Sequence, residues 1–346
     1  MLYVGLDLSR KRIDFHALRE DGELVERGAV AADRDGLARL VLRLAGHDRA
    51  VLAVIESMNG ARFVHDQLEL AGFEVEIADA QRVKGLAPLA CKTDRIDAWV
   101  LAELARRDLV PAVWLPDPSV REERERARFR LHLVRKRSAL KNRVHATLIA
   151  HGHACPPSDL FGAKGRALLA RLAIPEPWRG TLEASLRLID VLDSEIDALE
   201  RELRRLGAEH RYLPLLTTIP GIAWVLGYTI ASEIGDIHRF ASPRKLVGYS
   251  GLCPRVEQSG ERDRRGPITK NGPRYLRWAL IEAAQHAGRS SAYRGLYQRK
   301  RAQHPGPRGS KVAAICVGRK LAEAIWQMLS RNQPFAPAGA TLDLAA

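Results

Sequence analysis

The chain has 346 residues, 46% of them apolar, which is enough for two or three domains with their own hydrophobic cores. Lysine and arginine number 55 against 41 aspartates and glutamates, and the net charge of +14, carried mostly by arginine, predicts a polyanionic partner, with nucleic acid ahead of an anionic membrane surface. No apolar run approaches the roughly 18 residues of a membrane span, and the N-terminus resembles a strand rather than a signal peptide, so we expect a cytoplasmic protein with no membrane partner. The four cysteines lie far apart in the sequence with no CxxC pair, so we expect neither a zinc knuckle nor a disulfide framework.

The first third of the chain alternates between strand and helix patterns. Short apolar runs bounded by turn residues predict strands, and apolar positions in steps of three and four predict helices. In chain order these are strands at 2–8, 13–18 and 24–30, a helix at 33–45, a strand at 50–55, a helix at 60–71, a strand at 73–78 and a helix that carries Asp94 and Asp97. This order is that of a ribonuclease-H-like α/β domain, a mixed sheet with helices on both faces.

Four carboxylates stand where such a fold can bring them together. Asp7 lies inside an apolar strand, where an unpaired charge is costly to bury, and Glu56 ends the strand expected beside it. Asp94 and Asp97 are three residues apart and share one helix face, although such a pair alone is most often solvated surface. Clustered carboxylates repel one another unless a cation neutralises them, and hard oxygen ligands suit Mg²⁺. We therefore expect all four to form a Mg²⁺ site able to act on a phosphodiester.

The middle of the chain is basic and helical. Residues 121–143 carry ten Arg and Lys against three Glu, with a thin apolar seam. A charge run is usually a solvated helix face, but this excess is one-sided and long, which favours contact with a phosphate backbone.

A second helix, expected from Gly180 onward, carries isoleucine and leucine in steps of three and four from Ile189 to Leu206. This a/d pattern favours a two-stranded coiled coil, yet it is shorter than three heptads. Dimerisation and packing against the protein's own helices both remain open.

A Pro-Gly turn at residues 218–223 interrupts two apolar helical segments. It resembles the helix-hairpin-helix turn, in which backbone N–H groups hold a phosphate, but Ala223 replaces the usual second glycine. A phosphate contact and a plain helical turn are both open.

Glycines, prolines and an Asn-Gly pair mark residues 249–272 as a loop or short hairpin that leads into a helix at 274–287. The segment holds Ser259-Gly260 among many cations, with Ser250 as the competing serine. A serine nucleophile needs a base or a metal, no histidine lies close in sequence, and the carboxylate cluster is the best candidate to supply the base. The nearby cations that can bind nucleic acid are Arg262, Arg264, Arg265, Lys270, Arg274 and Arg277.

Taken in order, these motifs resemble the DEDD transposases of the insertion-sequence-110 type, which are relatives of the Piv DNA invertase. Downstream of Asp7 and Glu56, the matching stretches are KTDxxDA, IPGI, GLxPxxxxSG and KxGxxxLR, at residues 92–98, 219–222, 251–260 and 270–277. The resemblance reaches about Ala287. It departs from the family pattern at Ala223 and Pro273, neither of which touches the expected chemistry.

The resemblance implies a RuvC-like nuclease domain with Mg²⁺ on the four carboxylates, and a transposase domain in which Ser259 attacks the DNA phosphate to leave a covalent phosphoserine. It also implies donor and target DNA bridged by a structured noncoding guide RNA, dimers that pair into a tetramer, and association with a bacterial nucleoid. The expected segments are a RuvC-like DEDD domain (1–115), a basic helix, linker and coiled-coil region (116–208), a mainly α serine transposase domain (209–300), and a C-terminal helix and tail (301–346).

Two other functions remain open. A metal-dependent endonuclease of the Holliday-junction type would use the carboxylates alone and hydrolyse with water, leaving free ends where a recombinase traps a protein–DNA adduct. An inactive nucleic-acid scaffold is disfavoured by the complete carboxylate set, and it alone would be indifferent to Mg²⁺.

Overall fold

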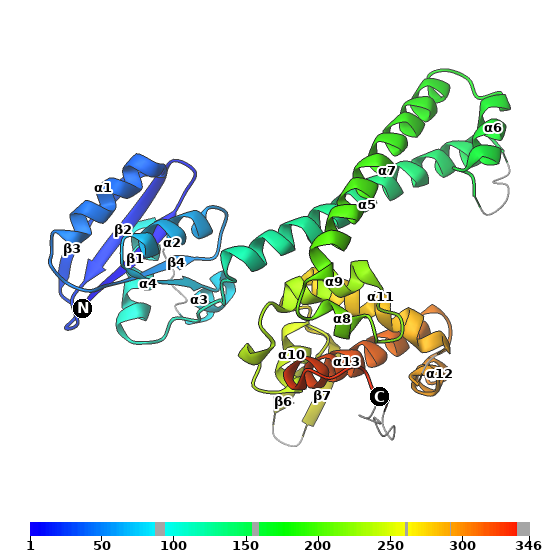
Figure 1. The fold of residues 1–346 in the computed structure, drawn as a ribbon. Coiled ribbons are helices and arrows are strands. Elements are labelled where there is room, and N and C mark those ends of the chain that lie inside the picture. Colours follow the sequence, from blue (N-terminus) through cyan, green and yellow to red (C-terminus); the bar gives the residue numbers. More distant parts are fainter. Residues whose placement is uncertain (87–93, 154–158, 260–261, 291, 338–346) are drawn as a thin grey trace. The chain divides into compact units, whose positions relative to one another are not determined.

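The computed structural model describes residues 1–86, 94–153, 159–259, 262–290 and 292–337 (Figure 1). The chain divides into two compact units, Met1–Leu115 and Pro116–Ala346. Among the described helices, none has the length and apolar content needed to cross a membrane.

A mixed β-sheet forms the centre of the first unit. In the described part of the unit its five strands have the order β3-β2-β1-β4-β5, with β1, β2 and β3 antiparallel and with β4 and β5 running parallel to β1. Each strand agrees with its expected range to within one residue. The strands are β1 (Leu2–Leu8), β2 (Arg12–Leu18), β3 (Leu24–Ala31), β4 (Val51–Glu56) and β5 (Glu74–Ala78).

Helices cover both faces of this sheet, as the sequence predicted. Leu37 of α1 and Leu68 of α2 pack on one face, in a core with the even-numbered residues of β1. Leu101 and Ala105 of α4 pack on the other face. A short helix, α3, was not predicted, and none of its residues is buried. The helices are α1 (Arg34–Ala45), α2 (Ala61–Leu70), α3 (Ala80–Leu86) and α4 (Asp94–Arg106).

Gly5 allows α4 to lie directly against β1. A Cβ atom at Gly5 would lie 1.9 Å from the carbonyl oxygen of Ala98 and 2.5 Å from the amide nitrogen of Ala102. Only a residue without a side chain fits at this point. Since strand side chains alternate between faces, Asp7, two residues further along β1, is on the α4 side of the sheet as well.

The second unit is mainly helical (Figure 1). Within residues 249–272, for which the sequence predicted a loop or a short hairpin, the strands β6 and β7 form an antiparallel hairpin. Its elements are α5 (Pro118–Ala150), α6 (Ala163–Arg171), α7 (Trp178–Ala208), α8 (Leu213–Leu216), α9 (Trp224–Ile234), η1 (Ile237–Arg239), α10 (Pro243–Tyr249), β6 (Pro254–Ser259), β7 (Arg262–Ile268), α11 (Arg274–Ser290), α12 (Arg294–Ala302) and α13 (Pro307–Arg331).

The helices α5 and α7 pack side by side in opposite directions (Figure 1). Ile189, Ile196 and Leu203, the a positions of the expected seam, are at most 4% exposed, and Leu203 packs with Ala127 of α5. The seam is therefore used for packing within the chain, which is one of the two alternatives that the sequence left open. Ion pairs also join the two helices, namely Arg126–Glu202, Arg130–Glu200 and Arg137–Asp193.

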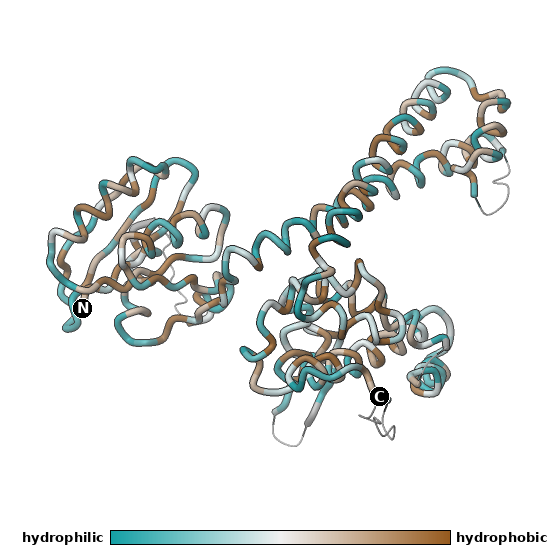
Figure 2. The backbone as a smooth tube through the Cα atoms, viewed as in Figure 1, coloured by the Kyte–Doolittle hydropathy of each residue, from teal (hydrophilic) through white to brown (hydrophobic). Residues whose placement is uncertain are grey.

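The main core of the second unit is formed by α9, α10, α11 and α13. Hydrophobic residues recur along α13, whereas α12 is largely hydrophilic (Figure 2). The Pro-Gly turn between α8 and α9 packs into this core. Gly221 has a φ of +89°, and a Cβ there would lie 2.7 Å from the carbonyl oxygen of Ala283 in α11. Packing against α11 thus accounts for the glycine of this turn.

Candidate active site and nucleic-acid interface

Asp7 and Glu56 lie at the ends of neighbouring strands, at one edge of the sheet. β1 and β4 run parallel with Leu6 opposite Ile55, so one further step of the register brings Asp7 beside Glu56. Both side chains are half-buried. The two carboxylates that the sequence assigned to a shared site are therefore on adjacent strands.

The same two residues lie on the face that α4 covers. Tyr3 of β1 and Val54 of β4 pack with Leu101 of α4. Asp7 and Glu56 follow these residues by an even number of positions, so they share the same face of the sheet.

The helix α4 runs antiparallel to β1. At its C-terminal end, Arg106 Nη1 donates a hydrogen bond of 3.1 Å to the carbonyl oxygen of Glu20, near the start of β1. The acidic start of α4 is therefore directed toward the end of β1 that carries Asp7.

Asp97 is half-buried and directly precedes Ala98, whose carbonyl oxygen fits against Gly5. This puts Asp97 close to the end of β1. Asp94 is the first residue of α4, and only its backbone is described. Residues 92–93 of the expected motif lie outside the described residues.

Asp14 of β2 is a carboxylate that the sequence reasoning missed. It is the cross-strand partner of Asp7, and Arg12 Nε and Nη2 donate to its two oxygens at 2.7 and 2.8 Å. Its side chain is 4% exposed. On the same face, burial and, after it, the charge of Arg27 lower the pKa of His16, which disfavours a positive charge on this imidazole. The alternation of polar and apolar residues along β2 was the signal that could have found Asp14.

The two candidate serines have different environments. Ser259 ends β6 at the tip of the hairpin, is exposed, and pairs with Arg262 across the tip. Ser250 is fully buried, and its Oγ donates a 2.7 Å hydrogen bond to the carbonyl oxygen of Val247. Ser259 is therefore the one open to a large substrate, while the hydroxyl of Ser250 is committed to the turn. Gly260 lies outside the described residues.

The cations near the hairpin differ in their contacts. Arg277 is half-buried and donates to the carbonyl oxygen of Ser250 at 3.2 Å, and its burial lowers its pKa. This contact supports the turn that ends at Ser250. Only the backbone of Arg262 is described, in β7. The cations that are exposed are Arg264, Arg265, Lys270 and Arg274.

Several arginines of the basic helix α5 have partners inside the protein. Arg124 is buried and donates to the carbonyl oxygens of Ser232 and Glu233 at 2.8 and 2.6 Å. Arg128 donates to both carboxylate oxygens of Glu233, which is fully buried. Burial would lower the pKa of Arg128, but the hydrogen bond and charge of Glu233 raise it. Three further arginines of α5 form the ion pairs with α7 described above. Many arginines of this basic helix therefore stabilise the fold and are not free to bind phosphate.

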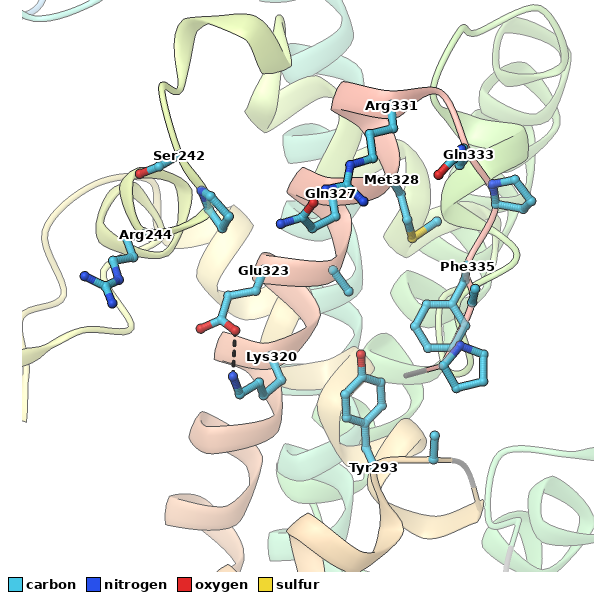
Figure 3. A pocket seen from close by; sticks show the side chains of 16 residues that line it. Ser242, Arg244, Tyr293, Lys320, Glu323, Gln327, Met328, Arg331, Gln333 and Phe335 are labelled. Carbon is cyan, nitrogen blue, oxygen red and sulfur yellow. Dashed lines mark hydrogen bonds and ion pairs between the residues drawn. The ribbon is translucent and has the colours of Figure 1, made fainter. Parts of the chain in front are cut away.

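A cavity of about 1080 Å³ lies elsewhere in the second unit, between α10, α13 and the segment that follows α13 (Figure 3). Its lining includes Tyr293, Gln327 and Phe335, and the ion pair Lys320–Glu323 lies at its wall. None of the expected catalytic residues lines it. The cavity is therefore not a candidate for the expected chemistry.

A second group of metal-binding side chains lies on α2, on the sheet face opposite α4. One ligand atom each of His65, Asp66 and Glu69 lie within 4.8 Å of one another. His65 Nδ1 is 3.2 Å from Asp66 Oδ1 and 3.5 Å from Glu69 Oε2. The hydrogen bond between His65 and Asp66, one residue apart on the helix, accounts for their closeness without a metal.

Two family models match the chain. One, described as the transposase IS116/IS110/IS902 family, matches residues 213–298 and includes the Ser259 hairpin. The other, a DEDD transposase model of the IS110 type, matches residues 4–151 and includes the four expected carboxylates. A DEDD transposase domain indicates use of a divalent metal.

Relatives that align along most of the chain carry transposase names. The transposase for insertion sequence element IS1328 of Yersinia enterocolitica is 27% identical, over 96% of this chain and 98% of the relative. A probable family 20 transposase of Pseudomonas aeruginosa is 26% identical over the same shares, and the transposase for insertion sequence element IS1111A of Coxiella burnetii is 25% identical over 82% and 78%. The matched segments are therefore transposase domains of the IS116/IS110/IS902 type, and together with these relatives they identify the chain as a DNA transposase.

Proposed function

We propose that this transposase cuts and rejoins DNA through the hydroxyl of Ser259, assisted by Mg²⁺ at Asp7, Glu56, Asp94 and Asp97. The observation that carries the proposal is the adjacency of Asp7 and Glu56 on the α4 face, toward which the acidic start of α4 is directed.

The strand order supports a ribonuclease-H-like, RuvC-like fold for residues 1–115. A central β1 flanked by an antiparallel β2–β3 pair and by parallel β4 and β5 is the arrangement expected for that fold. In open sheets with parallel strands, ligands bind beyond the carboxyl ends of the strands, where Asp7 and Glu56 are found.

The donor chemistry of this edge fits Mg²⁺. Carboxylate oxygens are the ligands that this hard cation prefers, and half-buried carboxylates close together gain from a neutralising cation. Asp14 illustrates the need for a neutralising cation at this edge, because the guanidinium of Arg12 neutralises its carboxylate within the fold. A bound Mg²⁺ would stabilise the negative charge that develops on a phosphodiester during displacement. Asp7, Glu56, Asp94 and Asp97 would hold it.

In the proposed reaction the Ser259 oxygen forms a bond to phosphorus, one P–O bond of the DNA backbone breaks, and the leaving oxygen is protonated. A serine hydroxyl is a weak nucleophile until a base or a metal activates it. Among the described residues, Ser259 Oγ has no hydrogen-bonded base. We propose that the carboxylate group accepts the proton, in the same subunit or in a neighbouring one, while exposed cations such as Arg264 and Lys270 bind the phosphate.

We extend the proposal to guidance by a structured noncoding RNA that bridges donor and target DNA, and to dimers that pair into a tetramer. These parts rest on the family resemblance. The net charge of +14 supports binding of nucleic acid and does not distinguish RNA from DNA. Sequencing of RNA that copurifies with the protein, and light scattering of the complex, would test both parts.

The second candidate is a metal-dependent endonuclease of the Holliday-junction type. It is favoured by one observation, that the expected carboxylates all belong to the compact unit Met1–Leu115 and require no serine. Such an enzyme would hydrolyse DNA with water and would leave no covalent intermediate.

Trapping of the covalent intermediate distinguishes the two candidates. Wild-type protein, incubated with nicked DNA, its copurifying RNA and Mg²⁺, should form a denaturant-stable adduct that mass spectrometry maps to Ser259. Ser259→Ala should form none. Cleavage by Ser259→Ala at the wild-type rate would establish the endonuclease, and an adduct on Ser250 would identify a different nucleophile.

A further inference from the structure

Three guanidinium groups converge on one aromatic ring in the second unit. The ring of Tyr275, in the first turn of α11, has the central guanidinium carbons of Arg128, Arg135 and Arg274 at 5.1, 5.7 and 4.9 Å from its centroid. Arg128 and Arg135 are seven residues apart on α5, which puts them on one helix face. Arg274 also donates a 2.9 Å hydrogen bond to the Tyr275 hydroxyl.

Only part of this positive charge is neutralised within the described structure. Arg128 donates to the two carboxylate oxygens of the buried Glu233 at 2.7 and 2.9 Å. Arg135 and Arg274 are exposed, and no described carboxylate forms an ion pair with either of them. Like charges held around one ring repel each other unless an anion joins them.

The contacts of Arg135 differ from those of four other arginines on α5. Arg126, Arg130 and Arg137 pair with carboxylates of α7, and Arg124 is held by backbone carbonyl oxygens. Arg135 contacts the face of an aromatic ring, which orients the guanidinium plane, and among the described residues no protein acceptor takes its N–H donors, which face solvent. Such a side chain is positioned for a ligand that supplies acceptor oxygens.

We propose that Arg135 and Arg274, oriented by Tyr275, form a subsite for a backbone phosphate of the nucleic acid that this transposase binds. The inference rests on the proposed nucleic-acid function and names one contact within it. Guanidinium forks bind two phosphate oxygens at once, and a phosphate between the two arginines removes their repulsion. Arg128, neutralised by Glu233, supports the ring. The shared chemistry is the phosphodiester of DNA and RNA, so the contact is independent of base sequence.

Salt-dependent binding of charge-matched variants tests the subsite. The variants are Arg135→Gln, Arg274→Gln and the double variant, with Arg137→Gln as the control, because Arg137 loses the same charge from the same helix but is paired with Asp193. Fluorescence anisotropy would give Kd for a labelled DNA duplex and, separately, for a labelled RNA hairpin over a series of NaCl concentrations. A loss in the DNA arm, the RNA arm or both identifies which backbone binds.

Each subsite variant should weaken binding on the order of tenfold and reduce the slope of log K against log salt by about 1, and the double variant by about 2. Arg137→Gln should match the wild type. Equal losses for all three single variants would indicate a general field effect and overturn the subsite, as would unchanged slopes. If the wild type binds neither DNA nor RNA, the proposed function falls together with the subsite, whereas wild-type binding with unaffected variants overturns the subsite alone.

Discussion

Asp14 of β2 lies directly opposite Asp7 of β1, so two carboxylates share one cross-strand pair on the face of the sheet that α4 covers. Like charges directly opposite on antiparallel strands destabilise a sheet unless a third group compensates them. Arg12 compensates Asp14 by donating to both of its oxygens. Arg12 therefore supports the charge balance beside the expected catalytic carboxylate.

Removal of Arg12 should destabilise the first unit. Arg12→Gln leaves the carboxylate of Asp14, whose side chain is 4% exposed, without this partner and next to Asp7. We expect a loss of about 1–3 kcal/mol in the free energy of unfolding. The double variant Arg12→Gln/Asp14→Asn should recover most of it, since the buried charge is then gone. Urea denaturation followed by circular dichroism measures both.

Arg19→Gln is the matched control for this experiment. Arg19 pairs with Glu23, and both side chains are well exposed, at 45% and 63%. Exposed pairs contribute little, so the change should stay within about 0.5 kcal/mol. Equal losses in Arg12→Gln and Arg19→Gln would contradict a special role for Arg12.

A side chain at Gly5 should push α4 away from β1. Gly5→Ala introduces a Cβ at 1.9 Å from the carbonyl oxygen of Ala98, which we expect to cost about 1–3 kcal/mol of unfolding free energy. Because α4 carries Asp97, Mg²⁺-dependent DNA cleavage should fall as well. Gly85→Ala on α3 is the control, since a Cβ there meets nothing within 4 Å and should be neutral or slightly stabilising. Thermal melting and cleavage rates that are alike in both variants would refute the close-packing argument.

The sheet and its helices could be predicted because their patterns are local. A strand such as Leu2–Leu8 is a continuous apolar run, and within it Asp7 stood out as a charge that needed a reason. The helix α3 was missed because none of its residues is buried, so no apolar period marks it. Asp14 was missed because what distinguishes it is its position opposite Asp7. The register that pairs β1 with β2 cannot be predicted from the sequence of either strand alone.

The basic helix illustrates a different limit of the sequence. Charge counts along residues 121–143 favoured phosphate contacts, yet Arg126 and Arg130 pair with Glu202 and Glu200 in α7. Those carboxylates lie about 70 residues away in the chain. Only the packing of the two helices separates the arginines that pair with carboxylates from those, such as Arg135, that contact an aromatic ring and have no ion-pair partner among the described residues.

Truncation of Ile196 should weaken the packing of α5 on α7 without changing the mass of the protein in solution. Ile196 is 2% exposed, so Ile196→Ala should cost about 2–4 kcal/mol in unfolding free energy. Val191→Ala is the control, because Val191 on the same helix is 59% exposed. Light scattering with chemical denaturation measures both quantities. A fall in the mass of Ile196→Ala with unchanged stability would instead indicate that the seam forms a dimer interface.

The acid stability of the first unit should depend on Glu103. The hydrogen bond from Arg106 is the largest effect on Glu103 and lowers its pKa, burial opposes it, and the hydrogen bond from Arg107 with the charges of both arginines brings the pKa to about 2. A pKa lowered on folding contributes stability above the ordinary value of 4.5, and this stability is lost as the pH falls toward 2. Glu103→Gln should therefore melt below the wild type at neutral pH, with the difference shrinking between pH 4.5 and about 2. A melting-temperature difference that does not change with pH would contradict this account.

Magnesium binding should depend on Asp97 and not on Glu69. This difference would distinguish the expected site, to which Asp97 belongs, from the acidic group on α2, to which Glu69 belongs. On α2, His65 Nδ1 already lies 3.2 Å from Asp66 and 3.5 Å from Glu69, and a ring nitrogen is a poorer ligand for Mg²⁺ than a carboxylate oxygen. Calorimetric titration of Mg²⁺ in the presence of DNA should give an affinity about tenfold weaker for Asp97→Asn, as expected for the loss of one charged ligand, and a wild-type affinity for Glu69→Gln. Each variant removes one negative charge from a helix of the same unit, so a difference between them cannot come from net charge. Weaker Mg²⁺ binding in Glu69→Gln alone would show that the metal binds on α2. Equal Mg²⁺ binding in both variants would show that Asp97 is not a ligand of the metal.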